Sequence, residues 1–201
     1  NQLPTGLHLG LGVRTVATTR NFTQGTPLES GKDLDVAISG DGFFQIQMPD
    51  GTTAYTRDGT FSKNGTGQLV TAGGYPLLDG ITVPANATRL SISKTGLVEV
   101  TVSGSATPQQ IGQLNTASFI NPAGLEPLGE NLFRETPASG TPQAGTPGSI
   151  NLGTVMQGFL ESSNVNVVEE LVAMIQTQRA YEMNSKAIST SDQMLAKLSQ
   201  L

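Results

Sequence analysis

A chain of 201 residues with 36% hydrophobic and 13% charged residues is long and apolar enough to form a packed core in one or two domains. Its net charge of -5 and singly scattered Lys and Arg residues argue against nucleic-acid binding, and the lack of cysteine excludes disulfides, thiolate nucleophiles and thiolate metal sites. No apolar run approaches the ~20 residues needed to cross a bilayer, and the chain does not begin with a positively charged and then apolar leader.

The first 30 residues show little helical periodicity. Aliphatic residues between Leu9 and Val16 are interrupted by Gly10 and Gly12, a pattern that favours extended chain over helix. We therefore predict that residues 1–30 are an extended arm that enters the fold.

Residues 31–135 have the pattern of an all-β domain built from short strands. Three β-hairpins are expected, with strands 43–48 and 55–57 around a turn at 49–51, a hairpin over 61–70 that turns at 64–67, and strands 90–93 and 97–102 around 95–96. No helical crossover separates the strands. This spacing favours an antiparallel β-sandwich or partly closed barrel over a parallel α/β sheet.

Residues 136–165 have the composition of a connector. Thr-Pro recurs at 136–137, 141–142 and 146–147, with glycines between the pairs. Because proline lacks a backbone donor and glycine resists ordering, we expect an exposed, semi-extended segment that returns the chain from the β-domain. Both ends of the chain are then expected to leave the β-body on one side.

Residues 166–201 have the apolar spacing of one long amphipathic helix. Asn166 followed by Glu169 resembles a capping box, and Glu169 and Glu170 place negative charge at the positive end of the helix dipole. A helix of about 33 residues would reach ~50 Å, which exceeds the width of a compact domain of this size. Its apolar stripe therefore needs cover from outside the β-domain, unless the helix is an ordinary core helix packed on its own sheet.

We expect the side chains of this stripe to mediate self-assembly. The residues predicted to bury a seam between helices are Val168, Leu171, Val172, Ile175, Met183, Ile188, Met194, Leu195 and Leu198. We assign Arg179, Tyr181 and Glu182 to polar or lateral contacts between helices, the alternative being solvated helix surface.

No set of residues predicts a catalytic or metal site. His8 is the single histidine and lies in the glycine-rich arm, so a histidine metal cage is excluded and a catalytic triad would depend on that arm. Acidic residues between Asp33 and Asp58 do not match a calcium-loop spacing. Ser91 and Lys94 match an S-x-x-K pattern, but inside a predicted hairpin and not at a helix start. The sequence thus predicts a protein that is not an enzyme, with no cofactor and no small-molecule substrate.

Several long motifs resemble one protein family. Residues 163–166, 168–172 and 174–182 are similar to the C-terminal signature of the bacterial flagellar axial proteins, the rod and hook family. Residues 35–44, 55–61, 67–75 and 129–133 are similar to the motifs of that family's β-domain. The resemblance covers nearly the whole chain and is strongest to the members that form the distal part of the rod.

The resemblance implies a structural subunit of the distal rod of the flagellar basal body. Such subunits polymerise helically into a hollow drive shaft that transmits torque to the hook and conducts exported subunits, with terminal helices packed around the channel and β-domains outside. It also implies proximal rod, hook and surrounding basal-body ring proteins as partners, export through the flagellar secretion apparatus, and a rod that spans the periplasm.

The family also has an N-terminal helix that pairs with the C-terminal one. Residues 1–30 show no helical pattern, and this difference predicts a truncated or processed chain that would polymerise poorly.

The residues leave a second function open, a secreted β-domain that binds a cell-wall glycan with the helix as a packing strut. Tyr55, Tyr75, Phe43 and Phe44 could form a sugar platform. The lack of Trp and the low aromatic content, 5%, favour core positions for these four side chains instead.

Overall fold

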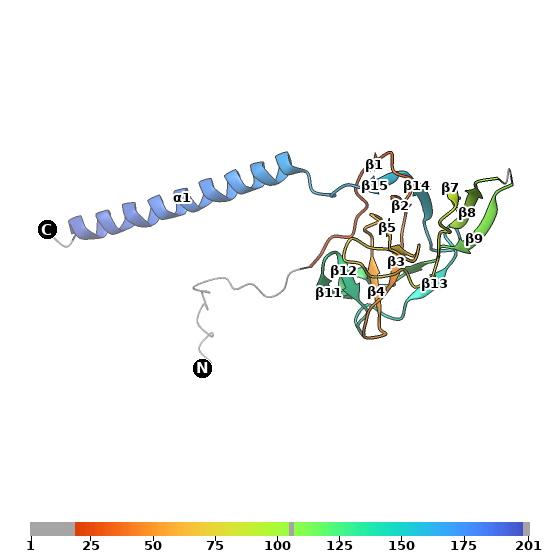
Figure 1. Ribbon diagram of the computed structural model, residues 1–201. Coiled ribbons are helices and arrows are strands. Elements are labelled where there is room, and N and C mark those ends of the chain that lie inside the picture. Colours follow the sequence, from red (N-terminus) through yellow and green to blue (C-terminus); the bar gives the residue numbers. More distant parts are fainter. Residues whose placement is uncertain (1–18, 105–106, 199–201) are drawn as a thin grey trace, which may run out of the picture. The chain divides into compact units, whose positions relative to one another are not determined.

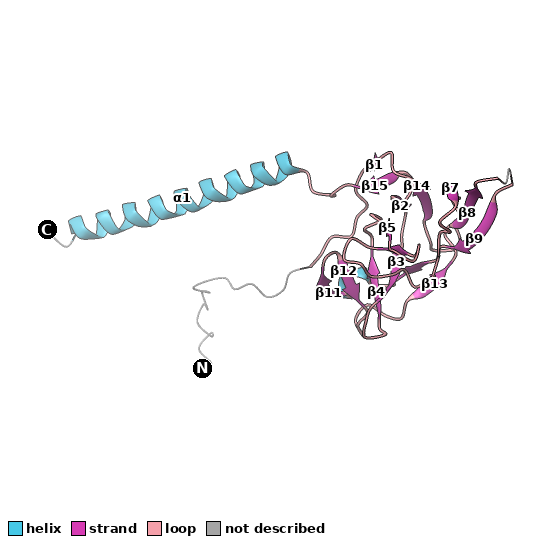
Figure 2. Cartoon of the chain, viewed as in Figure 1, coloured by secondary structure: helices cyan, strands magenta, loops and turns pink. Residues whose placement is uncertain are grey.

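The computed structural model describes residues 19–104 and 107–198, which divide into two compact units at Glu161 and Ser162 (Figure 1). The first unit is built from strands and the second contains one long helix, α1 (Val167–Leu198), as Figure 2 shows. His8 and residues 1–18 of the predicted arm lie outside the described residues.

The strands of the first unit are short, and every pair among the described residues is antiparallel. In chain order the elements are β1 (Pro27–Glu29), β2 (Val36–Ser39), β3 (Phe43–Gln47), β4 (Thr53–Thr56), β5 (Ser62–Lys63), β6 (Leu69–Val70), β7 (Ala87–Ile92), β8 (Leu97–Val102), β9 (Gln109–Gln113), β10 (Thr116–Ser118), the 3-10 helix η1 (Pro122–Gly124), β11 (Glu126–Gly129), β12 (Leu132–Arg134), β13 (Gln143–Gly145), β14 (Thr154–Gln157) and β15 (Phe159–Glu161).

These strands form several small sheets. The largest has the strand order β11-β12-β4-β3-β10-β13, and β7-β8-β9 form a second sheet. Pairs β1-β15, β2-β14 and β5-β6 complete the set. The prediction of a mainly β, antiparallel body with a long C-terminal helix is confirmed.

All three predicted hairpins are present. β3 pairs with β4, β5 with β6, and β7 with β8, each around the expected turn. In the first turn the carboxylate of Asp50 accepts hydrogen bonds from the backbone N–H and the hydroxyl of Thr52, at 2.9 and 2.6 Å. Such local bonds fix the turn, which explains why sequence alone located it.

Strand β3 supplies side chains to two separate cores, because successive residues of a strand point to opposite faces. Phe44 and Ile46 enter the main aliphatic core, which also receives Val98 and Val155. Phe43 points the other way, into an aromatic cluster that contains Tyr55, Phe119, Phe22 and Phe133. The central sheet is therefore covered on both faces.

The segment expected as an exposed connector, residues 136–165, differs in the structure. It contains three strands: β13 pairs with β10, β14 with β2, and β15 with β1. Ser139 and Val155 are buried, with exposed fractions of 0% and 1%. The Thr-Pro pairs lie outside the strands, and the residues between them form strands that pair with the rest of the body. This segment therefore completes the β-body up to Glu161.

Candidate assembly helix and chain-exit clamp

Helix α1 begins where the sequence predicts. The side-chain oxygen of Asn166 accepts a hydrogen bond from the backbone N–H of Val168 at 3.1 Å, and its carbonyl accepts the first helical bond, from Glu170. Glu169 and Glu170 lie in the first turn and Lys197 in the last. Asn166 therefore acts as the N-cap, and the terminal charges complement the helix dipole.

The predicted assembly residues all lie on α1, and those whose side chains the structure describes are uncovered. The exposed fractions of the eight described apolar or aromatic members range from 47% to 75%: Val168, Leu171, Val172, Ile175, Tyr181, Met183, Ile188 and Met194. Arg179 is also exposed. The side chains of Leu195 and Leu198 lie outside the described residues. At ~1.5 Å per residue the 32 residues of α1 extend about 48 Å.

The geometry of a regular helix divides these residues between two faces. With about 100° per residue, Val168, Val172 and Ile175 share one face. Tyr181 and Ile188, seven residues apart in the sequence, lie on nearly the opposite face. A single neighbouring helix can cover only one of these faces, so covering both faces would require neighbours on two sides of α1.

Two polar side chains of α1 satisfy their own hydrogen bonds. The hydroxyls of Thr177 and Thr190 donate to the carbonyls of Ala173 and Lys186, one turn earlier, at 2.9 and 2.7 Å. A hydroxyl bonded in this way needs no partner from a neighbouring molecule. These threonines can therefore be buried between helices at low cost.

The first and last strands of the β-body lie side by side. β1 pairs with β15, with Pro27 opposite Glu161. The chain therefore enters and leaves the body at the same end of this two-stranded ladder. The expectation that both chain ends leave the body on one side is confirmed.

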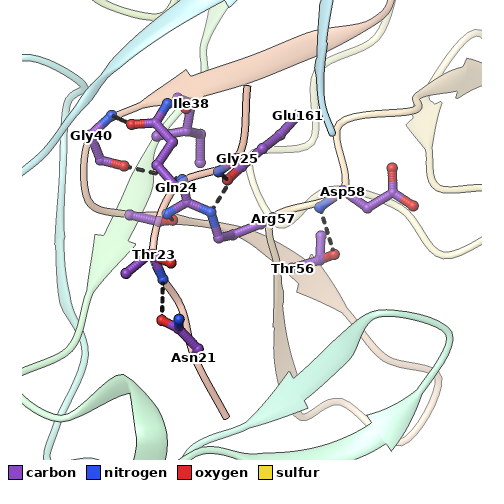
Figure 3. A network of polar contacts seen from close by, with 11 residues as sticks. Asn21, Thr23, Gln24, Gly25, Ile38, Gly40, Thr56, Arg57, Asp58 and Glu161 are labelled. Carbon is purple, nitrogen blue, oxygen red and sulfur yellow. Dashed lines mark hydrogen bonds and ion pairs between the residues drawn. The ribbon is translucent and has the colours of Figure 1, made fainter. Parts of the chain in front are cut away.

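A chain-exit clamp, formed by Gln24, Gly25, Arg57 and Glu161, holds this end of the ladder (Figure 3). One carboxylate oxygen of Glu161 accepts the backbone N–H of Gly25, and the other accepts Nε–H of Arg57, both at 2.9 Å. The side chains of Arg57 and Glu161 are only 16% and 14% exposed. Glu161 thus ties the entering chain to the leaving strand and both to the body.

Arg57 and Gln24 extend the clamp to the loop between β2 and β3. The two Nη groups of Arg57 donate to the carbonyls of Gly40 and Gly42, each at 3.2 Å. Gln24 donates to the carbonyl of Ile38 at 3.0 Å and accepts the N–H of Gly40 at 2.9 Å. Arg57 therefore joins the backbone of the loop between β2 and β3 to the carboxylate of Glu161, a role suited to the fork of donors on a guanidinium.

The clamp gives a testable expectation for the Glu161→Gln variant. Glutamine keeps the shape but removes the charge that pairs with Arg57, so we expect the free energy of unfolding to fall by about 1–2 kcal/mol, because hydrogen bonds to charged groups contribute ~1.5–3 kcal/mol. Urea unfolding measures the loss. Amide hydrogen exchange should also accelerate at Ser30, because its N–H donates to the carbonyl of Gly158 next to β15, at the end of the ladder that the clamp holds.

Glu126→Gln is the matched control. Its partner is also an arginine, Arg134, at 2.8 Å, but both side chains are about half exposed, at 50% and 49%. Exposed pairs contribute little, so this variant should lose less than about 0.5 kcal/mol. Equal losses in the two variants would contradict a special role for the clamp.

The aromatic residues considered for a sugar platform do not form one. Phe43, Phe44 and Tyr55 are buried, with exposed fractions of 2%, 0% and 3%. Burial and the neighbouring Glu135 carboxylate raise the pKa of Tyr55 to about 12. Three of the four side chains are thus core residues and cannot stack on a sugar.

No group of three or more His, Cys, Asp or Glu side chains in the described part of the chain is arranged to hold a metal ion. Within residues 19–104 and 107–198, the helices are too short or too polar to cross a membrane.

The clamp was not predicted from the sequence. Arg57 belongs to the motif at residues 55–61, which pointed to its importance without naming a partner. Glu161 lies 104 positions later in the chain, in a segment expected as a connector, and Gln24 lies in the expected arm. No local pattern connects these residues, because β-pairing between the two ends of the body brings them together.

Comparisons with known proteins agree on one kind of protein. The family described as "Flagellar hook protein FlgE/F/G D1 domain" matches residues 37–100, and "Flagellar basal body rod FlgEFG protein C-terminal" matches residues 156–201. The chain is 57% identical to the flagellar basal-body rod protein FlgG of Buchnera aphidicola subsp. Acyrthosiphon pisum, over 99% of the chain and 76% of that protein.

Relatives from another bacterium extend the comparison. The chain is 50% identical to FlgG of Caulobacter vibrioides, over 100% of the chain and 77% of that protein. It is 36% identical to the basal-body rod protein FlgF of the same organism, over 89% of the chain and 69% of that protein.

Proposed function

The chain belongs to the family of flagellar basal-body rod proteins, and from this premise we propose that α1 is the element through which copies of the chain assemble into the rod. The protein is a structural subunit of the flagellar basal body. The observation that carries the proposal is the exposure of eight apolar or aromatic side chains along one helix.

Self-assembly is supported by the physical state of α1. A lone helix in water is marginally stable, since most helical stability in proteins comes from packing. Each large apolar side chain gains about 1.5–3 kcal/mol when it is fully buried. Because Ile175 and Ile188 lie on nearly opposite faces, helices on two sides are needed to cover them. Layers of parallel helices around a channel provide such neighbours.

We propose a place for the chain within the flagellum. We assign it to the distal rod, as a helical polymer that forms a hollow shaft between the proximal rod and the hook. The shaft crosses the periplasm inside the basal-body rings, transmits torque and conducts exported subunits. The identity with rod proteins named FlgG, 57% and 50%, supports this assignment.

Because the sequence predicts a chain that polymerises poorly, the test is its association as the concentration rises to high values. We expect sedimentation velocity to show growing assemblies, and hydrogen exchange of α1 to be fast in dilute monomer and slow in the assemblies. Electron microscopy then shows whether the assemblies are elongated. Protection of α1 in the dilute monomer, or a strict monomer with unprotected α1 at high concentration, would overturn the proposal.

A further inference from the structure

The turn between β5 and β6 contains the one Asn-Gly pair of the chain, Asn64-Gly65. Asparagine is a thermolabile residue, because its side-chain amide can react with the backbone nitrogen of the next residue. Glycine at that next position leaves the nitrogen accessible, since it has no Cβ to crowd the reaction. Both residues are exposed, and no atom lies within 4 Å of a Cβ built on Gly65. The pair therefore has the composition and the access of a deamidation site.

Deamidation of this pair needs no reactant other than water. The backbone nitrogen of Gly65 loses its proton to solvent and attacks Cγ of Asn64, and the new bond closes a succinimide ring. The bond between Cγ and Nδ2 breaks, and Nδ2 takes up a proton and leaves as ammonia. Water then opens the ring at either of its carbonyl groups, which gives aspartate or isoaspartate at position 64.

In the folded chain the side chain of Asn64 is held by its own turn. Its Oδ1 accepts hydrogen bonds from the backbone N–H of Thr66 at 3.0 Å, the hydroxyl of Thr66 at 2.7 Å and the backbone N–H of Gln68 at 2.9 Å. Nδ2, which is the leaving group, donates to Oε1 of Gln68 at 3.3 Å. To close the ring, the side chain and the following peptide must rotate toward each other, which breaks some of these bonds.

The backbone on both sides of the pair is fixed as well. The N–H of Asn64 donates to the carbonyl of Gln68, and the carbonyl of Asn64 accepts the N–H of Gly67, both at 3.0 Å. The turn therefore restrains the peptide that carries the attacking nitrogen as well as the amide that it attacks. Reaction in the folded chain requires the turn to open first.

We propose that Asn64 is a deamidation site that the folded turn protects and the unfolded chain exposes. Unfolding removes the protecting bonds together, because they all connect residues of a single turn. Conversion at Asn64 is then a covalent record of the time that a copy of the chain has spent unfolded. Isoaspartate also lengthens the backbone next to the pairing of Lys63 with Leu69, whose side chain is in the core at 2% exposure.

The rates of conversion in the folded and the unfolded chain test the proposal. The whole chain is incubated at mildly alkaline pH in buffer and in urea, and mass spectrometry of the peptide that contains Asn64 follows the conversion. We expect the rate in buffer to be at least about tenfold lower than in urea, because opening the turn costs two or more hydrogen bonds. Asn184, which is followed by serine, is the internal reference and should convert more slowly than Asn64 in urea.

The Thr66→Val variant separates protection by the turn from the reactivity of the pair itself. Valine has the shape of threonine but lacks the hydroxyl that donates to Oδ1, and Thr66 is exposed, so the fold should be retained. We expect conversion in buffer to rise several-fold and conversion in urea to stay the same. Thr66→Ser keeps the hydroxyl and is the matched control, with rates close to those of the wild type. Gly65→Ala should slow conversion in both solutions, because its Cβ shields the nitrogen.

Three outcomes would overturn the proposal. Equal rates in buffer and in urea would mean that the turn gives no protection. An unchanged rate of Thr66→Val in buffer would mean that the bonds to Oδ1 do not provide the protection. Faster conversion at Asn184 than at Asn64 in urea would mean that Asn64 is not the reactive site of the unfolded chain.

Discussion

The Ile175→Asp variant should lose self-association while its β-body stays folded. Ile175 is 47% exposed on the face of α1 that it shares with Val168 and Val172. An unpaired carboxylate buried between helices costs about 3–5 kcal/mol, and every subunit of an assembly carries it. We therefore expect the concentration needed for assembly to rise by more than about a hundredfold, since each 1.4 kcal/mol is a factor of ten.

Sedimentation velocity measures this loss, and urea unfolding checks the β-body, whose stability should not change because α1 belongs to a separate compact unit. Gln176→Asp is the matched control. It introduces the same residue in the same turn, at a polar position about 100° around the helix. Assembly of Ile175→Asp at the wild-type concentration, or equal losses in the two variants, would show that this face does not form the seam.

Features that depend on neighbouring residues were predictable from the sequence. The helix start was located to within one residue, because Asn166 and the two following glutamates act on the backbone of the same turn. The three hairpins were located because their turns are fixed by residues such as Asp50, whose side chain bonds two positions ahead. In each case the interaction that decides the structure spans fewer than five residues.

Features that depend on distant residues were not predictable in the same way. β14 pairs with β2 and β15 with β1 across more than a hundred positions, and nothing in the local composition of residues 136–165 indicates these partners. The Thr-Pro pattern indicates turns correctly but does not show that the residues between turns join sheets. Arg57 and Glu161 meet only because β15 pairs with β1, so the clamp could not be predicted from the sequence either.

The division of α1 into two apolar faces is present in the spacing of its residues, but the same spacing also fits one broad apolar stripe. A helix that carries apolar residues on nearly opposite sides gives the same list of residues as a wide single face. The two arrangements differ in how many neighbours each helix needs. Val168 and Ile175 are seven residues apart and mark the first face. Tyr181 and Ile188 are also seven residues apart, but they lie on nearly the opposite side of the helix and mark the second face.

The Gly59→Ala variant should unfold the β-body or lose at least about 3 kcal/mol of stability, as expected when a core is overpacked. A Cβ atom at Gly59 would lie 1.6 Å from the carbonyl oxygen of Val36, which is backbone and cannot rotate away. The carbonyl of Gly59 also accepts the N–H of Val36 at 3.0 Å. The extra methyl group therefore forces apart a contact that aligns β2 with the turn after β4.

Gly65→Ala separates this steric effect from the general effect of replacing a glycine. Gly65 lies in the turn between β5 and β6, with no atom within 4 Å of an added Cβ. It is not among the glycines with positive φ, so alanine fits its backbone and should change stability by no more than about 0.5–1 kcal/mol, in the stabilising direction. Urea unfolding compares the two variants. A Gly59→Ala protein as stable as Gly65→Ala would mean that the backbone at Val36 yields, and that residues 55–61 do not need glycine for packing.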